Sequence, residues 1–178
     1  PKLSFVGVVD ADLGLGNGDL RAAERTYQML SQVAGRAGRE TTGGRALLQT
    51  HMPEHPVLQA LVSGDRDAFL EREAEAREQA AMPPFGRLGA IIISATDQQE
   101  GLAFVTELAR KTPAHEHVRV LGPAPAPIAR IRDRYRFRFL LKAGRQAPLQ
   151  AFISQWLSAA PRRGSIRISV DIDPYSFL

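Results

Sequence analysis

The segment Met82-Pro83-Pro84-Phe85-Gly86 interrupts the chain near its middle and limits the possible folds more than any other feature. Paired prolines cannot continue a helix, and they make a stiff connector. The chain has 178 residues, of which 44% are hydrophobic, enough for two small domains with modest cores. We therefore expect one domain over residues 1–81, a linker at 82–86 and a second domain over 87–178.

The first half has the pattern of a β-α-β unit followed by helices. The apolar, β-branched run 3–9 is typical of a buried parallel strand, and 46–49 is a second strand. A helix is expected between them, capped by Asp19 and running from residue 20 to about residue 37. The segment 55–81 has a helical pattern. Because a buried strand needs neighbours on both sides, we expect further sequence upstream of Pro1.

The second half alternates strands and helices in the order β-α-β-β-α-β. Strands are expected at 88–95 and 118–121, then a Pro-rich bend at 122–127, a strand-turn-strand over 128–142 and a last strand at 165–172. The helices are expected at 98–111 and 147–159. In the last strand, apolar and polar residues alternate as in a sheet with one buried face. The predicted class is α/β, with an α+β second domain of the ferredoxin-like, or split β-α-β, type.

Charge and cysteine content bound the functions further. Residues 1–85 carry 9 Lys+Arg against 12 Asp+Glu, and residues 86–178 carry 14 against 7, so the basic surface is expected in the second half. The absence of cysteine excludes disulfides and thiolate metal sites, and we predict no metal site in this chain. Without a long apolar run or a signal pattern, a cytoplasmic protein with no membrane partner is expected.

The sharpest local motif is Gln32-Val33-Ala34-Gly35-Arg36-Ala37-Gly38-Arg39. At 100° per residue, one narrow stripe of the predicted helix holds Arg21, Arg25, Gln28, Gln32, Arg36 and Arg39. Apolar residues occupy much of the opposite side. A glycine in a helix costs about 1 kcal/mol relative to alanine, so the two glycines suggest close approach of the backbone to a ligand. A frayed helix end with solvated arginines is the alternative.

This motif resembles the last conserved motif of superfamily 2 helicases, and the surrounding sequence narrows the resemblance. It is similar to the PriA family of replication-restart helicases, the primosomal N′ proteins. The matching segments follow in order from about Val6 to the C-terminus: Val8-Val9-Asp10-Ala11-Asp12, Arg21-Ala22-Ala23-Glu24-Arg25, the motif itself, Gln49-Thr50-His51-Met52-Pro53-Glu54-His55-Pro56, Pro83-Pro84-Phe85, Leu121-Gly122-Pro123-Ala124-Pro125 and Asp171-Ile172-Asp173-Pro174.

The resemblance implies roles for single residues. Residues 1–81 would end a RecA-like motor lobe, in which Arg36 and Arg39 act as arginine fingers on the γ-phosphate of ATP and Gln32 couples the nucleotide state to DNA binding. ATP and Mg²⁺ would be bound only by the full-length protein, and zinc by a module upstream. None of the three lysines follows a glycine, so this chain lacks a Gly-Lys-[Ser/Thr] phosphate loop and is expected to be inactive alone.

A second constellation lies in the basic half, where arginines alternate with Ile131, Tyr135, Phe137 and Phe139. It consists of Arg130, Arg132, Arg134, Arg136 and Arg138. Within 134–139 the arginines should point to one face of a strand and the aromatic residues to the other. Like charges on one strand face indicate an anionic partner, and DNA phosphates fit best. Alternatively the arginines are a solvated face. The resemblance implies branched or fork DNA, single-strand-binding protein and other primosome proteins as partners.

Two other readings stay open. A stand-alone nucleic-acid-binding module without motor function would explain the basic half, but it leaves the Gln32–Arg39 motif unexplained. A nucleotide-dependent oxidoreductase rests only on the glycines between Gly14 and Gly18, where the third glycine of a dinucleotide fingerprint is replaced by Asp19. We interpret that segment as a turn.

Overall fold

The computed structural model describes residues 3–15, 20–37, 44–161 and 164–174. The chain divides into two compact units, Pro1–Ala74 and Glu75–Leu178, and each is described by itself. The division falls inside the helix α3 (Arg66–Gln79), upstream of the Pro-Pro segment. The chain as a whole is mixed α/β, as predicted.

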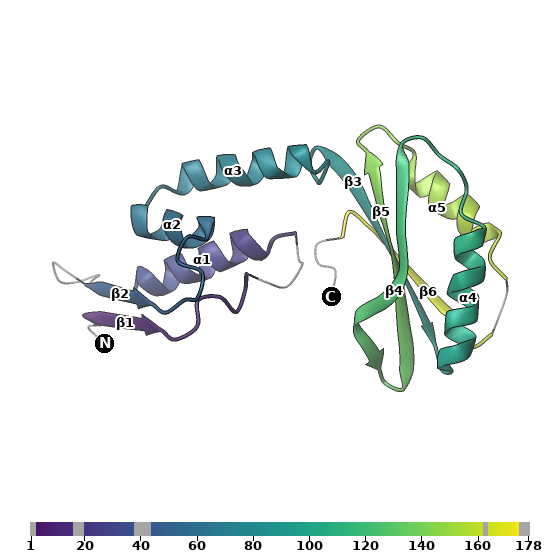
Figure 1. The fold of residues 1–178 in the computed structure, drawn as a ribbon, viewed down its shortest axis with the longest axis horizontal. Coiled ribbons are helices and arrows are strands. Elements are labelled where there is room, and N and C mark those ends of the chain that lie inside the picture. Colours follow the sequence, from purple (N-terminus) through teal and green to yellow (C-terminus); the bar gives the residue numbers. More distant parts are fainter. Residues whose placement is uncertain (1–2, 16–19, 38–43, 162–163, 175–178) are drawn as a thin grey trace. The chain divides into compact units, whose positions relative to one another are not determined.

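The first unit contains the predicted β-α-β unit (Figure 1). The strands β1 (Phe5–Val8) and β2 (Arg45–Leu48) pair in parallel, and α1 (Ala22–Ala34) connects them. The segment expected to be helical forms α2 (Pro56–Ser63) and the charged helix α3. They separate at Gly64, whose φ of 73° lies in the left-handed region that glycine adopts most easily.

The burial expected for the first strand is not found. Phe5 is 56% exposed and Leu47 on β2 is 61% exposed. The reason is that, within the described residues, the sheet has only these two strands. The packed part of this unit lies instead around Leu30 of α1, with Ala11 and Leu58, and around Phe69, whose ring stacks on Tyr27 at 5.0 Å. The expected cap, Asp19, lies outside the described residues.

The second unit is a four-stranded antiparallel sheet with two helices. Its elements in chain order are β3 (Gly86–Ala95), α4 (Gln98–Arg110), β4 (Val118–Ile131), β5 (Arg134–Gly144), α5 (Leu149–Ser158) and β6 (Arg167–Ile172). The strand order is β4-β5-β3-β6, so β5 lies between β3 and β4 and splits the β3-α4-β4 unit. This is the order of elements that the sequence predicts.

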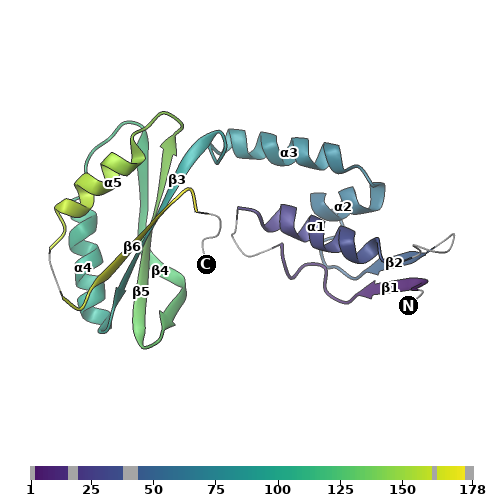
Figure 2. The same cartoon turned by 180° about the vertical axis from the view of Figure 1, so that it is seen from behind.

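Both helices of this unit cover the same face of the sheet (Figure 1, Figure 2). The core lies between them and includes Ile91 and Ile93 of β3, Phe139 of β5 and Trp156 of α5. The rings of Phe139 and Trp156 lie 5.0 Å apart, edge to face, and the indole Nε1 of Trp156 donates to the carbonyl of Leu108 at 2.9 Å. Among the described residues of this unit, no helix covers the opposite face. We call that surface the helix-free face.

The bend expected at 122–127 is wrong, because β4 continues through these residues to Ile131. Proline lacks a backbone N–H and is tolerated mainly in edge strands and at bulges. β4 is an edge strand, and its pairing with β5 shifts register between Leu121 and Ala124 and again between Pro125 and Arg130. The prolines therefore fit an irregular edge strand.

Candidate nucleic-acid interface

The alternation along β5 separates arginines from aromatic residues as the sequence predicts. Phe137 and Phe139 are opposite Ile93 and Ile91 and are buried in the core beneath the helices. The residues between and beside them, Arg136 and Arg138, therefore lie on the helix-free face.

The strand β6 adds a further cation to this face. Ser94 of β3 is opposite Arg136 on one side and Arg167 on the other, so the three residues form a row across three strands. Two residues earlier on β3, Ile92 is opposite Arg138 on β5 and Ser169 on β6. The constellation predicted from the sequence did not include Arg167, although the alternation of Arg167 and Ser169 with isoleucines was the signal that could have placed it there.

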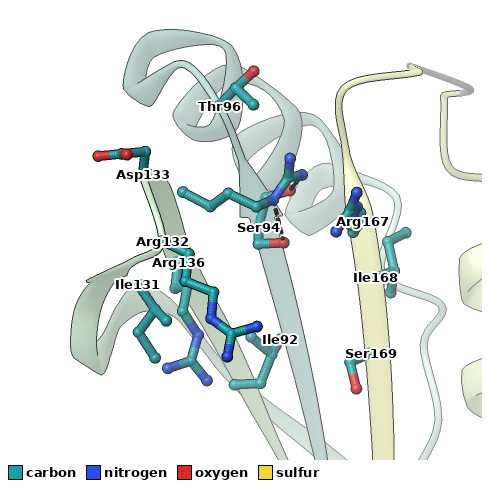
Figure 3. Close-up of a pocket in the computed structure, with 11 residues that line it drawn as sticks. Ile92, Ser94, Thr96, Ile131, Arg132, Asp133, Arg136, Arg167, Ile168 and Ser169 are labelled. Carbon is teal, nitrogen blue, oxygen red and sulfur yellow. Dashed lines mark hydrogen bonds between the residues drawn. The ribbon is translucent and has the colours of Figure 1, made fainter.

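Most of these residues, Arg138 excepted, line a hollow of about 660 Å³ on the helix-free face (Figure 3). Figure 3 shows Arg136 on one side of the hollow, Arg167 on the other and Ser94 between them. The complete lining is Ile92, Ser94, Thr96, Ile131, Arg132, Asp133, Arg134, Arg136, Arg167, Ile168 and Ser169.

Arg134 differs from its neighbours because its guanidinium group is engaged within the protein. Its Nε donates to the hydroxyl of Ser94 at 3.2 Å, and one terminal nitrogen donates to the Ser94 carbonyl at 2.8 Å and also to the Ser165 carbonyl. The side chain thus connects β5, β3 and the segment before β6. It positions the wall of the hollow and has few donors left for a ligand.

Arg130 and Arg132 lie at the β4–β5 connection. Arg130 forms an ion pair with Asp133 at 2.9 Å, and its guanidinium carbon lies 5.2 Å from the ring centre of Tyr135. Arg132 and Asp133 form the turn with φ of 48° and 59°, values typical of a two-residue hairpin turn. Arg132 is exposed and lines the hollow.

Arg136, Arg138 and Arg167 are available on the helix-free face. The side chains of Arg138 and Arg167 have no hydrogen bond or ion pair with any described residue, and that of Arg136 has only a long contact of 3.4 Å to the Ile128 carbonyl. Without a paired carboxylate, their positive charges are available to an anion. The structure therefore brings together three of the residues that could bind phosphate: Arg136, Arg138 and Arg167.

The motif predicted to contact ATP lies in the other unit. Gln32 is exposed on α1, and Arg36 is exposed just after this helix ends, where its N–H donates to the Val33 carbonyl at 3.2 Å. Leu30 of the same helix is 1% exposed. The helix thus has a buried side and a polar side, as expected, while Arg39 lies outside the described residues.

Asp12 joins the carboxyl ends of β1 and β2, the edge where parallel sheets place ligand sites. Its carboxylate accepts hydrogen bonds from the Thr50 hydroxyl and from the His51 N–H, the latter at 2.7 Å. These bonds, with the Thr50 bond first, hold the pKa of Asp12 below its usual value, because they stabilise the ionised form. Asp12 is therefore a structural acceptor at this edge.

The described residues contain neither a metal-ligand cluster nor a membrane-spanning helix. No group of three or more His, Asp or Glu side chains in those parts of the chain could hold a metal ion. In the same parts, no helix is both long and apolar enough to cross a membrane.

Comparison with known proteins decides the family. The sequence model described as "Primosomal protein N C-terminal domain" matches residues 78–175, more than half of the chain and nearly all of the second unit. The chain belongs to this family.

Relatives extend the similarity over the first unit as well. "Replication restart protein PriA" of Rickettsia conorii is 39% identical over 177 residues, which cover 99% of this chain and 27% of that protein. The protein of the same name from Bacillus subtilis is 32% identical over 183 residues, which cover 100% of this chain and 23% of that protein. The chain therefore spans about a quarter of the length of the curated relatives it matches.

Proposed function

We propose that this chain is the C-terminal part of an ATP-dependent DNA helicase that restarts stalled replication forks, and that its second unit binds DNA through the helix-free face. The observation that carries the proposal is the grouping of Arg136, Arg138 and Arg167 on one face without a paired carboxylate. Guanidinium groups bind phosphate oxygens through two donors at once, and DNA offers phosphates in a row. The family name supports this substrate.

In the first unit, we assign Arg36 and Arg39 as arginine fingers that reach the γ-phosphate of ATP, and Gln32 as the residue that couples nucleotide state to DNA. The unit would then be the end of a RecA-like motor lobe. Its parallel β-α-β unit and the exposed position of Gln32 and Arg36 support this assignment. ATP and Mg²⁺ would be held together with other parts of the full-length protein, and a zinc module would also lie there.

The proposed partners are those that the resemblance to the family implies, and the relatives' name, replication restart protein, supports a role in replication. They are branched or fork DNA, single-strand-binding protein and other primosome proteins, in the cytoplasm. A stand-alone nucleic-acid-binding module is the second candidate function, which the basic helix-free face supports equally well. The two candidates differ in whether Arg36 and Arg39 are needed for ATP turnover in the longer protein.

The DNA interface is tested by the salt dependence of binding. Each phosphate contact that an arginine makes releases counterion, so log affinity falls with log salt by about 0.9 per contact on duplex DNA. Replacing Arg136, Arg138 and Arg167 together with glutamine should weaken binding of a fork DNA and flatten this slope by roughly 2 to 3. Fluorescence anisotropy over a salt series measures both quantities. Arg134 is left intact because of its internal hydrogen bonds.

A matched control removes the same number of charges elsewhere. Arg66, Arg110 and Arg145 are exposed and lie outside the hollow. Their triple replacement with glutamine should change the slope little, and the melting temperatures of both variants should remain near that of the parent chain. If the two triple variants lose affinity and slope equally, only the net charge matters and the helix-free face is not the interface.

A further inference from the structure

The hollow on the helix-free face has apolar as well as basic lining, and phosphate contacts leave the apolar part unused. Ile92 and Ile131 line it together with the hydroxyl-bearing residues Ser94 and Ser169. Ile131 is 39% exposed. A site for phosphate alone needs only cations and donors, so the aliphatic surface indicates a ligand that is partly apolar.

The positions of the two arginines fit a ligand that has an apolar ring and an anionic group attached to it. Arg136 and Arg167 are opposite neighbours of Ser94 on two sides, so their Cα atoms lie about 10 Å apart across three strands. The hollow lies between these two side chains (Figure 3). A flat ring can therefore enter between them while its anionic group reaches either guanidinium.

The polar groups of the lining favour an anion as well. Asp133 lines the hollow, but its carboxylate is paired with Arg130 at 2.9 Å. The Ser94 oxygen accepts from Arg134, which leaves its hydroxyl proton free to be donated. The Ser169 hydroxyl has no hydrogen-bond partner among the described residues. The hollow thus offers hydrogen-bond donors and positive charges, and the charge of its one carboxylate, Asp133, is neutralised by Arg130.

The geometry points to one unstacked nucleotide of single-stranded DNA as the occupant of this hollow, with its base against Ile92 and Ile131 and its phosphate on Arg136 and Arg167. This inference rests on the proposed function and names the form of DNA that the face selects. A base within a duplex is stacked and paired and cannot enter a hollow unless it is flipped out. An unpaired base can, and guanidinium planes as well as apolar side chains accept its flat faces.

The test uses the whole chain and three labelled probes of equal length in fluorescence anisotropy. The probes are a single-stranded thymidine oligonucleotide, the same sugar-phosphate chain without bases, and a duplex. The intact strand should bind more tightly than the abasic strand by about 3-fold to 10-fold, as expected when one or two bases gain a stacking surface. The duplex should bind no more tightly than the abasic strand.

A variant of the apolar lining separates the base from the phosphates. Ile131→Ser should bring the intact-to-abasic affinity ratio close to one while leaving the affinity for the abasic strand unchanged. Ile131 is partly exposed at the end of β4, so the fold should tolerate the change, and the melting temperature checks this. The matched control is Ile128→Ser on the same strand, which is 49% exposed and does not line the hollow.

The outcomes distinguish this inference from the proposed function. Equal affinity for the intact and abasic strands overturns the inference alone, provided that Arg136→Gln and Arg167→Gln still weaken both. If those two changes affect no probe, the DNA interface itself is wrong. If an acidic peptide binds with dependence on both arginines and the single strand does not, the hollow serves a protein partner and the inference is overturned.

Discussion

Arg134 and Arg138 lie four residues apart on the same face of β5, but their side chains have different surroundings. The guanidinium of Arg134 donates to Ser94 and to the Ser165 carbonyl, whereas the guanidinium of Arg138 has no partner among the described residues. The sequence pattern groups both arginines together because alternation shows which face of the strand a side chain is on. It does not show which residues of the neighbouring strands that side chain contacts. Arg134 therefore has a positioning role, and of the two arginines Arg138 is the one available to an anion.

This division predicts different effects on stability. Arg134→Gln should lower the free energy of unfolding by about 1 to 3 kcal/mol, because hydrogen bonds from a charged donor are lost and part-buried acceptors are left unpaired. Arg138→Gln should stay within about 0.5 kcal/mol of the parent chain. Urea titration followed by the fluorescence of the buried Trp156 measures both. Equal stability of the two variants would show that the Arg134 hydrogen bonds contribute nothing.

Asp12 gives a prediction about acid stability in the first unit. Because the folded-state pKa of Asp12 lies below its unfolded value of about 3.9, its stabilising effect is fully present above that pH and is lost as the pH falls through the folded value. Asp12→Asn should therefore lower the melting temperature at pH 7, and the difference from the parent should shrink below about pH 4. Thermal melting by circular dichroism over this pH range measures the difference.

Removal of the main hydrogen-bond donor provides the control. Thr50→Val keeps the Asp12 carboxylate but removes the largest cause of its lowered pKa. The melting temperature of Thr50→Val should lie below that of the parent at pH 7, by less than that of Asp12→Asn does. This difference from the parent should also shrink below about pH 4. A difference between Asp12→Asn and the parent that stays constant from pH 7 to pH 2 would contradict an ionised, hydrogen-bonded Asp12.

At the scale of elements, local sequence patterns predicted most helices and strands. Which of their residues are buried depends instead on the tertiary structure. The helix predicted at 98–111 is observed as Gln98–Arg110, and the last strand as Arg167–Ile172. The prolines of 122–127 were misread, because only the sheet order shows that β4 is an edge strand where missing N–H groups do no harm. Likewise, exposure of Phe5 depends on which strands lie beside β1, which no local pattern gives.

The candidate site was predictable to a similar extent. The period-2 alternation placed Arg136 and Arg138 on one face and Phe137 and Phe139 on the other. The same alternation in the last strand could have placed Arg167 on that face, but its position opposite Ser94 depends on the register between β3 and β6, which the sequence does not specify. The hollow between the strands likewise depends on the partners across the sheet.

The close contact between α4 and the sheet at Gly101 predicts that alanine at this position lowers the stability, although helix propensity alone would predict the opposite. A Cβ atom on Gly101 would lie 2.6 Å from Cε2 of Phe137 and 3.0 Å from the Cβ of Ala95. Gly101→Ala should therefore destabilise the second unit by about 1 to 3 kcal/mol, since overpacking outweighs the gain of up to about 1 kcal/mol in helix propensity. Gly164→Ala, whose added Cβ has no atom within 4 Å, is the control and should be nearly neutral. Chemical denaturation measures both, and a more stable Gly101→Ala variant would mean that α4 shifts at no cost.

At the scale of the whole molecule, the proposed function assigns different roles to the two units. The first has exposed donors at the end of α1, and the second has a basic face with a hollow. The sequence has no Gly-Lys-[Ser/Thr] loop to hold the phosphates of ATP. Binding DNA and hydrolysing ATP should therefore be separable properties, the first present in this chain and the second dependent on the rest of the full-length protein.

The purified chain should bind fork DNA but show no ATP turnover that depends on DNA. In the full-length protein, Arg36→Ala and Arg39→Ala should each lower kcat by up to the 10³-fold to 10⁵-fold that arginine fingers contribute elsewhere, because the charge that develops on the γ-phosphate is no longer neutralised. The Kd for fork DNA should stay within about twofold of the parent, since neither arginine is among the residues proposed to bind DNA. A coupled phosphate-release assay and anisotropy measure the two quantities, with Arg45→Ala, an exposed arginine at the start of β2, as the control. Turnover that survives both changes would leave the chain with its DNA-binding role alone, which is the stand-alone module.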